Sequence, residues 1–410
     1  MPGSSRHPPR RKPPSLGLRR GCPRHRAGAT EGGAGATKGV IAAAAFLPQS
    51  GNSAAEMRVV FVLSYPATYS IARVEDWLAW DNRDRRMPAL LAEMGVDCEL
   101  WGVTGEAATF VSETGFGAPY AIRLFPVSNP QARPRDHYSD AMVEAARADA
   151  ADLFVVIGTN GGAGYRLFDR ALRPDRRRFA VVIGGDYWSR LVPAAAFLFP
   201  ESARQEQALA HPGGRFWRRA IPRARMQRLP KSIDTDRFRP QEATPRWDVI
   251  AVSRLVRWKS FEEIGALSAT HRVAVVGGGE REAELRARFP KVDWLGSVPN
   301  RHVPALIAQA RLFLHAGRRD YFPRAIVEAM ACGRPVVAFD DRIGADVVPP
   351  DCGLLVSDAD YRARVAALLG DPARLAAMGA AARAHAVTTH GLRSSEPACR
   401  TLLALAEAGR

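Results

Sequence analysis

The chain has 410 residues, enough for two ordinary domains that each bury a core. Its composition, with 47% hydrophobic, 24% charged and 8% aromatic residues, predicts a globular protein, and no window offers the ~20 consecutive apolar residues of a membrane helix. The formal net charge of +16 makes nucleic acid, anionic lipid and phosphorylated ligands the partner classes to weigh.

Much of the positive charge lies in the first 56 residues, which carry nine Lys or Arg against two Glu. This segment lacks periodic apolar residues, so we expect a disordered basic leader over 1–56. The run GVIAAAAFL (39–47) is only mildly apolar and follows a long basic stretch, which argues against a secretory signal. A clean strand pattern begins at Met57. The alternative explanation of residues 1–56 is that the ordered protein begins at Met57 and the leader is a dispensable or wrongly included extension.

The remaining sequence has no aromatic-interleaved basic ribbon, no RRM-like motif and no zinc-finger spacing, so we expect no nucleic-acid partner. Its other arginines fit solvated helix faces, which is the plainer interpretation of the charge. The five cysteines are widely spread and form no C-x-x-C pair. This pattern favours reduced thiols in the cytoplasm over disulfides or a zinc site.

From residue 57 to 183, short β-rich runs alternate with helical patterns, as in parallel sheets covered by helices. Pro88 should interrupt the first helix, since proline lacks the N–H that a helix interior uses. Strands are expected near 58–63, 97–103, 153–157 and 179–183, and helices near 75–94 and 139–150.

The same alternation returns after a proline-containing linker over 226–248. The fold class expected is therefore α/β, with two doubly wound units in tandem. Strands are expected near 248–252, 272–276, 292–295, 311–315, 335–339 and 353–356, and helices near 260–269, 280–289, 302–310, 324–332 and 360–370.

Open parallel sheets bind ligands at the carboxyl ends of their strands, so the loops that follow strands deserve inspection. After the strand at 248–252 comes SRLVRWKS, which places Arg254 and Lys259 beside a helix N-terminus. Two cations there suit a diphosphate, because fixed charge adds to unsatisfied backbone N–H groups. A solvated basic loop is the alternative.

After the strand at 272–276 comes a glycine-rich turn, GGGEREAELRARF, which includes Gly277 and Gly278. The spacing fails the dinucleotide fingerprint, since the count from Gly277 reaches Glu282 where a glycine is required. The glycines would permit close backbone approach to a ligand, or only tight packing of the turn.

After the strand at 311–315 comes AGRRDYFPRAIVEAMACG, in which Asp320 precedes a helix that carries Glu328. Ile326, Ala329 and Met330 follow helical spacing toward the core, leaving Glu328 on an adjacent face. Cleft-facing carboxylates beside cations can accept hydrogen bonds from sugar hydroxyls. The alternative is that the acids only complement the dipole at the helix N-terminus, which explains Asp320 well but Glu328 poorly.

These segments together resemble the large retaining glycosyltransferase family four (glycosyl transferases group 1) over about 229–356. DYFPRAIVEAMACGRPVVAFD looks like its E-x7-E segment, VSRLVRWKS is similar to its G-R-L-x-x-x-K-G loop, and LPKSIDTDRFRP resembles its interdomain segment. The resemblance implies the GT-B fold, two facing Rossmann-like domains with an interdomain cleft and no metal or other cofactor.

By position in the motif, Arg254 and Lys259 would neutralise the diphosphate of a nucleotide sugar, and Glu328 would hold its ribose. The sugar hydroxyls would be held by Asp320 and by backbone groups of Tyr321, Phe322, Pro323 and Arg324. The resemblance also implies front-face transfer with retention of the anomeric configuration. Fixed cations would then stabilise the leaving group, which is electrostatic catalysis.

The chain departs from the family pattern at several positions. Asp320 is one methylene shorter than the usual Glu, and Pro323 replaces a glycine and removes one backbone donor. In the first half, the paired glycines of the family are missing, and IGGDYWSR stands where a histidine is frequent. Asp186 in that segment is our candidate for a cleft residue that touches donor sugar or acceptor, the alternative being a polar turn residue. The run GTNGGAG (158–164) is a second candidate contact.

The resemblance divides the chain into the leader at 1–56, an acceptor domain at 57–229, a nucleotide-sugar donor domain at 230–385 and a terminal helix at 386–410 that packs back on the acceptor domain. The acceptor would be a glycan or lipid-linked molecule, reached from the cytoplasm or in peripheral contact with the inner face of a membrane. Three other functions stay open: a nucleotide-sugar epimerase, a catalytically silent nucleotide-sugar-binding protein and a polyanion-binding protein.

Overall fold

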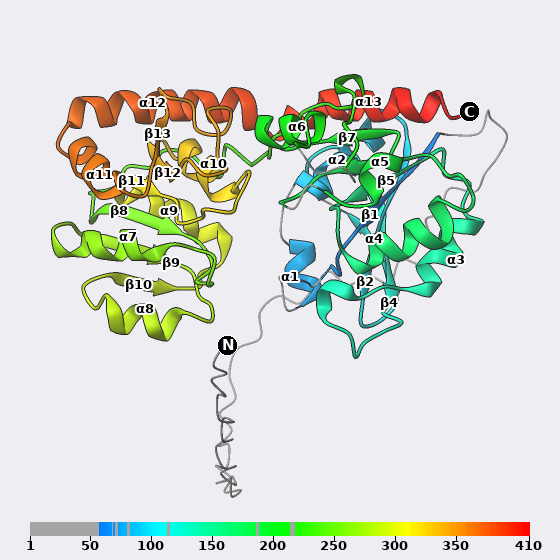
Figure 1. Ribbon diagram of the computed structural model, residues 1–410, viewed down its shortest axis with the longest axis horizontal. Coiled ribbons are helices and arrows are strands. Elements are labelled where there is room, and N and C mark those ends of the chain that lie inside the picture. Colours follow the sequence, from blue (N-terminus) through cyan, green and yellow to red (C-terminus); the bar gives the residue numbers. More distant parts are fainter. Residues whose placement is uncertain are drawn as a thin grey trace, which may run out of the picture. The chain divides into compact units, whose positions relative to one another are not determined.

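The computed structural model describes residues 57–67, 69, 73–79, 83–112, 115–185, 188–213 and 218–410. Two sheets organise these residues into a first lobe, built on β1–β7, and a second lobe, built on β8–β13 (Figure 1). The expected disordered leader falls outside the described residues.

The first sheet has seven strands in the order β3-β4-β2-β1-β5-β6-β7. All neighbouring pairs are parallel except β3 and β4, which form an antiparallel edge. The strands are β1 (Arg58–Leu63), β2 (Asp97–Thr104), β3 (Ala108–Ser112), β4 (Tyr120–Pro126), β5 (Leu153–Ile157), β6 (Phe179–Val182) and β7 (Phe197–Phe199).

The second sheet has six parallel strands in the order β10-β9-β8-β11-β12-β13. Numbered along the chain, this is the doubly wound order 3-2-1-4-5-6. The first sheet repeats it once its edge strand β3 is set aside. The α/β prediction of two doubly wound units is confirmed. The strands are β8 (Trp247–Val252), β9 (Val273–Val276), β10 (Asp293–Gly296), β11 (Ala310–Leu314), β12 (Val336–Phe339) and β13 (Gly353–Val356).

Helices cover both faces of each sheet, because buried parallel strands are apolar on both sides. In β8, Ile250 packs into the core beneath α9 and α10, while Val249 and Ala251 pack beneath α7, α8 and α11. The helices are α1 (Val74–Ala79), α2 (Arg83–Glu93), α3 (Asp140–Ala148), α4 (Gly162–Leu167), α5 (Leu191–Ala194), α6 (Ala203–Ala210), α7 (Phe261–Ala266), α8 (Glu282–Arg288), α9 (Val303–Ala308), α10 (Arg324–Ala331), α11 (Tyr361–Leu369), α12 (Pro372–His390) and α13 (Glu396–Glu407).

Helix α10 carries the predicted carboxylate Glu328 and has clear sequence limits. It begins after Pro323, whose fixed φ of −76° suits the N-cap. It ends at Ala331, and two residues later Gly333 adopts a φ of +69° while the N–H of Arg334 bonds to the carbonyl of Ala329 at 3.0 Å. This is a glycine C-cap, and it turns the chain directly into β12.

The prediction that Pro88 interrupts a helix over 75–94 was wrong. The structure has two helices there, α1 and α2, and Pro88 lies inside α2. Because α2 begins only five residues earlier, the proline forfeits one hydrogen bond near the helix start, and its ring is buried, as are the neighbouring side chains of α2. Burial of the ring offsets the lost bond.

The terminal helices divide between the lobes. Helix α12 contributes Ala382 and Ala386 to a core of the second lobe, while α13 contributes Cys399 and Leu402 to a core of the first. Residue 386, where the terminal helix was expected to begin, therefore lies within α12. None of the described helices combines the length and hydropathy that crossing a bilayer requires.

Candidate functional site

The second sheet brings two of the predicted loops together at its carboxyl edge. Strand β8 lies between β9 and β11 in the sheet. After β8 the next strand is added on one side, and after β11 the next strand is added on the other, so the strand order reverses between β8 and β11. A crevice forms at such a point. The loops after β8 and β11 are joined there, since the N–H of Ser260 bonds to the carbonyl of Ala316 at 2.8 Å.

Lys259 and Asp320 meet at this edge of the second sheet. The Nζ atom of Lys259 forms an ion pair with Oδ2 of Asp320. His315, which ends the β11 segment, bonds through Nε2 to the same oxygen at 2.9 Å. The lysine is 7% exposed and the histidine 2%, so this group is largely withdrawn from water.

The charges of this group follow from its surroundings. Burial would raise the pKa of Asp320, but the hydrogen bond from His315 and the charge of Lys259 outweigh it and hold that pKa well below its usual range. Burial lowers the pKa of His315, which the bond to Asp320 only partly reverses. At pH 7, Asp320 is therefore an anion and His315 a neutral ring.

Gly317 leaves room for the three side chains. A Cβ at this position would overlap Oδ2 of Asp320 and would lie 2.5 Å from Nε2 of His315 and 2.7 Å from Nζ of Lys259. The site therefore depends on a residue without a side chain. Neither His315 nor Gly317 was among the predicted site residues.

Glu328 forms a second group, on α10. It is 5% exposed, and its Oε1 accepts hydrogen bonds from Nε of Arg324 at 2.8 Å and from Nδ2 of Asn300 at 3.3 Å. Arg324 is one turn before Glu328 on the helix, the spacing at which such pairs meet. Asn300 is in turn held by Arg237 at 3.2 Å. The sequence analysis did not select Asn300.

The two cations predicted to bind a diphosphate differ in their surroundings. Lys259 is buried and paired, whereas Arg254 is exposed. The Arg254 guanidinium lies 5.9 Å from the ring centroid of Trp258, which is 44% exposed. No ion pair joins Arg254 to another residue in the described part of the chain. Arg254 is thus available to an anion, while Lys259 must exchange one partner for another.

The glycine-rich turn after β9 packs against the loop after β8. A Cβ at Gly277 would overlap the carbonyl oxygen of Ser253, and one at Gly278 would lie 2.7 Å from Oγ of Ser297. Gly277 also has a φ of +139°, which disfavours other residues. These contacts favour the packing interpretation of the glycines, and a role in ligand binding stays a prediction.

The residues between Asp320 and α10 are anchored by their side chains. Tyr321 and Phe322 are 9% and 4% exposed. The ring of Tyr321 lies 4.9 Å from the Arg342 guanidinium, and the ring of Phe322 lies 5.5 Å edge-on from His390. This anchoring fixes the backbone that the prediction assigns to the donor sugar.

The first lobe has a pocket of about 250 Å³ at its own reversal point, between the loops after β1 and β5. Tyr65, Tyr69 and Trp77 contribute aromatic walls, and Glu201 pairs there with Arg83 at 3.0 Å. Sequence reasoning selected none of these five residues. A buried arginine and glutamate far apart in sequence leave no local signal.

The predicted residues of the first lobe have mixed outcomes. Asp186 lies outside the described residues. Glycines of the 158–164 run pack closely on the β1 loop, since a Cβ at Gly161 would overlap the Ser64 carbonyl. Gly158 lines the pocket.

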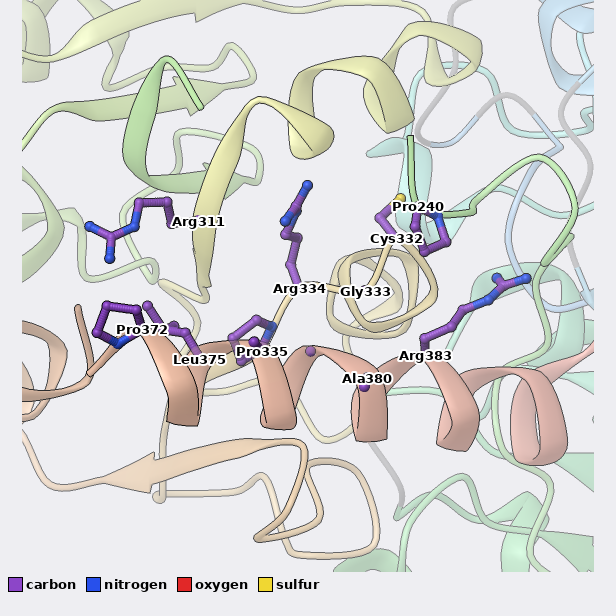
Figure 2. A pocket seen from close by; sticks show the side chains of 12 residues that line it. Pro240, Arg311, Cys332, Gly333, Arg334, Pro335, Pro372, Leu375, Ala380 and Arg383 are labelled. Carbon is purple, nitrogen blue, oxygen red and sulfur yellow. The ribbon is translucent and has the colours of Figure 1, made fainter. Parts of the chain in front are cut away.

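A larger hollow, of about 540 Å³, lies at the amino ends of β11 and β12, away from Lys259 and Asp320. Figure 2 shows that its arginines point apart: Arg311, Arg334 and Arg383 extend in different directions. Arg383 is already bonded to three backbone carbonyls, those of Thr235, Phe238 and Ala331. The hollow therefore lacks convergent groups for an anion.

Metal ligands do not gather in the described part of the chain, where no group of three His, Cys, Asp or Glu is placed to hold an ion. The candidate site instead holds paired charges, Lys259 with Asp320 and Arg324 with Glu328. The expectation that no metal takes part stays a prediction.

Comparison with known proteins identifies the second lobe. Residues 248–371 match the family model of the glycosyl transferases group 1. The second lobe therefore resembles the group 1 glycosyltransferases. The match covers β8 to α11 and therefore includes both carboxylates of the candidate site.

Curated relatives match part of the chain. A GDP-mannose-dependent α-(1-6)-phosphatidylinositol monomannoside mannosyltransferase of Mycolicibacterium smegmatis is 34% identical over 43% of this chain and 56% of its own length. A GDP-mannose-dependent α-mannosyltransferase of Mycobacterium tuberculosis is 28% identical over 41% and 45%. The chain spans about half of the length of the curated relatives it matches.

Solved structures confirm the GT-B fold of the chain. Sucrose-phosphate synthase of Thermosynechococcus elongatus aligns with a TM-score of 0.63 at 16% identity, over 85% of this chain and 99% of that one. HepE of Anabaena, solved in complex with UDP, aligns with a TM-score of 0.60 at 17% identity, over 85% and 100%. At such identities the likeness establishes the fold alone.

Proposed function

We propose that the protein is a retaining glycosyltransferase that moves a sugar from a nucleotide-diphosphate donor to an acceptor. The observation that carries the proposal is the ion pair of Lys259 with Asp320 at the carboxyl edge of the second sheet. A buried cation there can neutralise a diphosphate, and a fixed carboxylate beside it can accept hydrogen bonds from sugar hydroxyls. Glu328, held by Arg324 and Asn300, is the proposed ribose contact.

In the proposed reaction, the acceptor oxygen forms a bond to the anomeric carbon while the bond from that carbon to the donor phosphate breaks. The electron pair leaves with the diphosphate, whose growing charge is stabilised by Lys259 and Arg254. The proton of the acceptor hydroxyl passes to the departing phosphate oxygen. Attack from the same face retains the anomeric configuration, so the proposal needs neither an enzyme nucleophile nor a metal.

We propose GDP-mannose as the first donor to test. Six of the seven curated relatives are named as GDP-mannose-dependent mannosyltransferases. One relative, from Arabidopsis thaliana, is named as a subunit of a phosphatidylinositol N-acetylglucosaminyltransferase, so UDP-N-acetylglucosamine is the second donor to test. Several relatives are named for phosphatidylinositol mannosides, which supports a lipid-linked acceptor at a membrane surface.

The cytoplasmic face of the membrane is the proposed setting, because the four described cysteines are buried and unpaired. The acceptor would enter through the first lobe, whose pocket between the β1 and β5 loops offers aromatic walls. Aromatic faces and a buried carboxylate suit a polyol ring.

The experiment that tests the proposal begins with a thermal-shift screen of the protein against GDP, UDP, ADP and their sugars. A ligand at ~100 times its dissociation constant stabilises a protein by about 2.7 kcal/mol. Transfer from the binding donor is then measured with Lys259→Ala and Glu328→Ala, beside the matched controls Lys291→Ala and Glu407→Ala at exposed positions. We expect the site variants to lose ~100-fold or more of kcat/KM and the controls to keep it.

Two further readouts address the finer parts of the proposal. Product anomeric configuration by NMR tests retention, and an inverted product would refute it. Turnover in the presence of a chelator tests metal independence, and loss of activity that added magnesium restores would refute that part. If both site variants turn over at the wild-type rate, the proposed function itself is refuted.

A further inference from the structure

His315 has no role in the proposed function, yet it is among the most enclosed polar residues of the second lobe. It follows β11 directly and is 2% exposed. Its backbone N–H bonds to the carbonyl of Val337 on β12 at 2.9 Å, which fixes the ring at the sheet edge. The ring thus rises from rigid structure, whereas Asp320 lies in a loop.

The hydrogen bonds of Asp320 are distributed unevenly between its two oxygens. Lys259 and His315 both reach Oδ2, and no hydrogen bond from the described residues reaches Oδ1. One oxygen is therefore held by the protein, and the other is left to accept from a ligand hydroxyl. The missing side chain of Gly317 provides the space in which these bonds form.

The protonation of the histidine follows from this geometry. An ionised carboxylate can only accept hydrogen bonds. The Nε2 atom of His315 therefore carries the ring proton and donates a hydrogen bond to Asp320. The other nitrogen, Nδ1, is buried without a hydrogen-bond partner among the described residues. A neutral ring leaves a lone pair unpaired there, whereas a charged ring would leave an unpaired N–H. Asp320 and Lys259 are the charged groups that act on the ring.

We infer that His315 is a positioning residue, which holds Asp320 in its working orientation when Lys259 turns from Asp320 to the donor diphosphate. The inference rests on the proposed function of this site. In the free protein, Lys259 and His315 share the carboxylate. A diphosphate competes for Lys259, and the bond from His315 then keeps Oδ1 directed at the sugar.

This role fits the shorter acid of the chain. An aspartate reaches less far than a glutamate, so its carboxylate needs support close to the backbone. His315 supplies that support from the end of a buried strand, five residues before Asp320. A hydrogen bond to a charged group contributes about 1.5–3 kcal/mol, which corresponds to ~10- to 100-fold in rate when it is made in the transition state.

The test compares His315→Gln, whose amide nitrogen can still donate, with His315→Phe, which fills the space without donating. With the donor that wild type uses, we expect His315→Phe to lower kcat by ~10- to 100-fold. The dissociation constant for GDP or UDP alone should stay near the wild-type value, because Lys259 and Arg254 remain. His315→Gln should recover most of the rate. His271→Gln, in the loop before β9, is the matched control and should change nothing.

Ring nitrogen NMR of the wild-type protein provides a measurement that does not depend on a variant folding. We expect a neutral ring protonated at Nε2 between pH 7 and 8, in the free protein and with GDP or UDP added. A charged ring, the other tautomer, or wild-type kcat in His315→Phe would overturn the inference. If wild type neither binds a nucleoside diphosphate nor transfers sugar, the proposed function fails, and the ring tautomer still decides whether His315 holds Asp320.

Discussion

The Nδ1 atom of His390 lies 2.8 Å from the carbonyl oxygen of Lys231. A second hydrogen bond joins the same two segments: the N–H of Ile233 donates to the carbonyl of His390 at 2.8 Å. These bonds tie the segment that enters the second lobe to the last residue of α12. Because Phe322 packs edge-on against the same imidazole, His390 also supports the loop that carries Asp320.

Acid should weaken the fold through His390. The side chain is fully buried, and burial lowers the pKa of His390 from 6.5 to about 4. A base whose pKa is lowered in the folded state binds its proton more readily in the unfolded state. The stability that the neutral histidine contributes above its unfolded pKa is therefore lost as pH falls from about 6.5 to about 4. The loss over that window is about 3 kcal/mol of unfolding free energy.

His390→Asn isolates this effect, because its amide can donate to Lys231 without titrating. We expect the unfolding free energy of wild type minus that of the variant, from urea titrations, to fall by about 3 kcal/mol between pH 7 and pH 4. The corresponding difference for His271→Asn should change much less. A difference for His390→Asn that is independent of pH would show that His390 titrates normally.

Gly317→Ala should impair the site more than the fold. The new Cβ would overlap Oδ2 of Asp320, so the carboxylate must leave Lys259 and His315. We expect kcat to fall by ~10-fold or more, with a loss of about 1–2 kcal/mol in unfolding free energy. The control is Gly105→Ala, where a Cβ would meet nothing within 4 Å. Unchanged kcat in Gly317→Ala would mean that Asp320 does not work from its observed position.

The sequence predicts the two sheets well because their strands are short, apolar and separated by helical patterns. Strands β3, β4 and β7 escaped prediction. Strands β3 and β4 mix buried and exposed residues, β4 includes the charged Arg123, and β7 has only three residues. Pro88 misled the helix prediction because a local rule ignores what the buried ring gains from packing. In each case tertiary contacts outweigh the local pattern.

The site divides in a similar way. Lys259, Asp320 and Glu328 could be selected from charge and position after strands, and the structure brings the first two together. His315 was read only as the end of an apolar strand, although a histidine closing such a run is a usable signal. Asn300 gives no such signal, because its contact with Glu328 spans 28 residues and depends on how the loop after β10 folds.

Asn300→Ala should weaken donor binding through Glu328. The substitution removes one of the two hydrogen bonds at Oε1 and leaves Arg324 as the remaining donor. We expect the dissociation constant for GDP or UDP to rise by ~3- to 10-fold, with little change for a 2′,3′-dideoxy nucleotide that lacks the ribose hydroxyls. Calorimetry with both ligands checks this. Equal weakening of both would place Glu328 away from the ribose.

Asp320→Glu tests whether the site is built for the shorter acid. One added methylene moves the carboxylate past the point where Lys259 and His315 meet at Oδ2, and His315 at the rigid end of β11 cannot follow. We therefore expect kcat to fall by ~10-fold or more, although the family usually has glutamate there. Asp341→Glu, in the exposed pair with Arg318, is the matched control and should keep full activity. Equal or faster turnover by Asp320→Glu would show that the lost methylene is a handicap and that His315 does not make up for it.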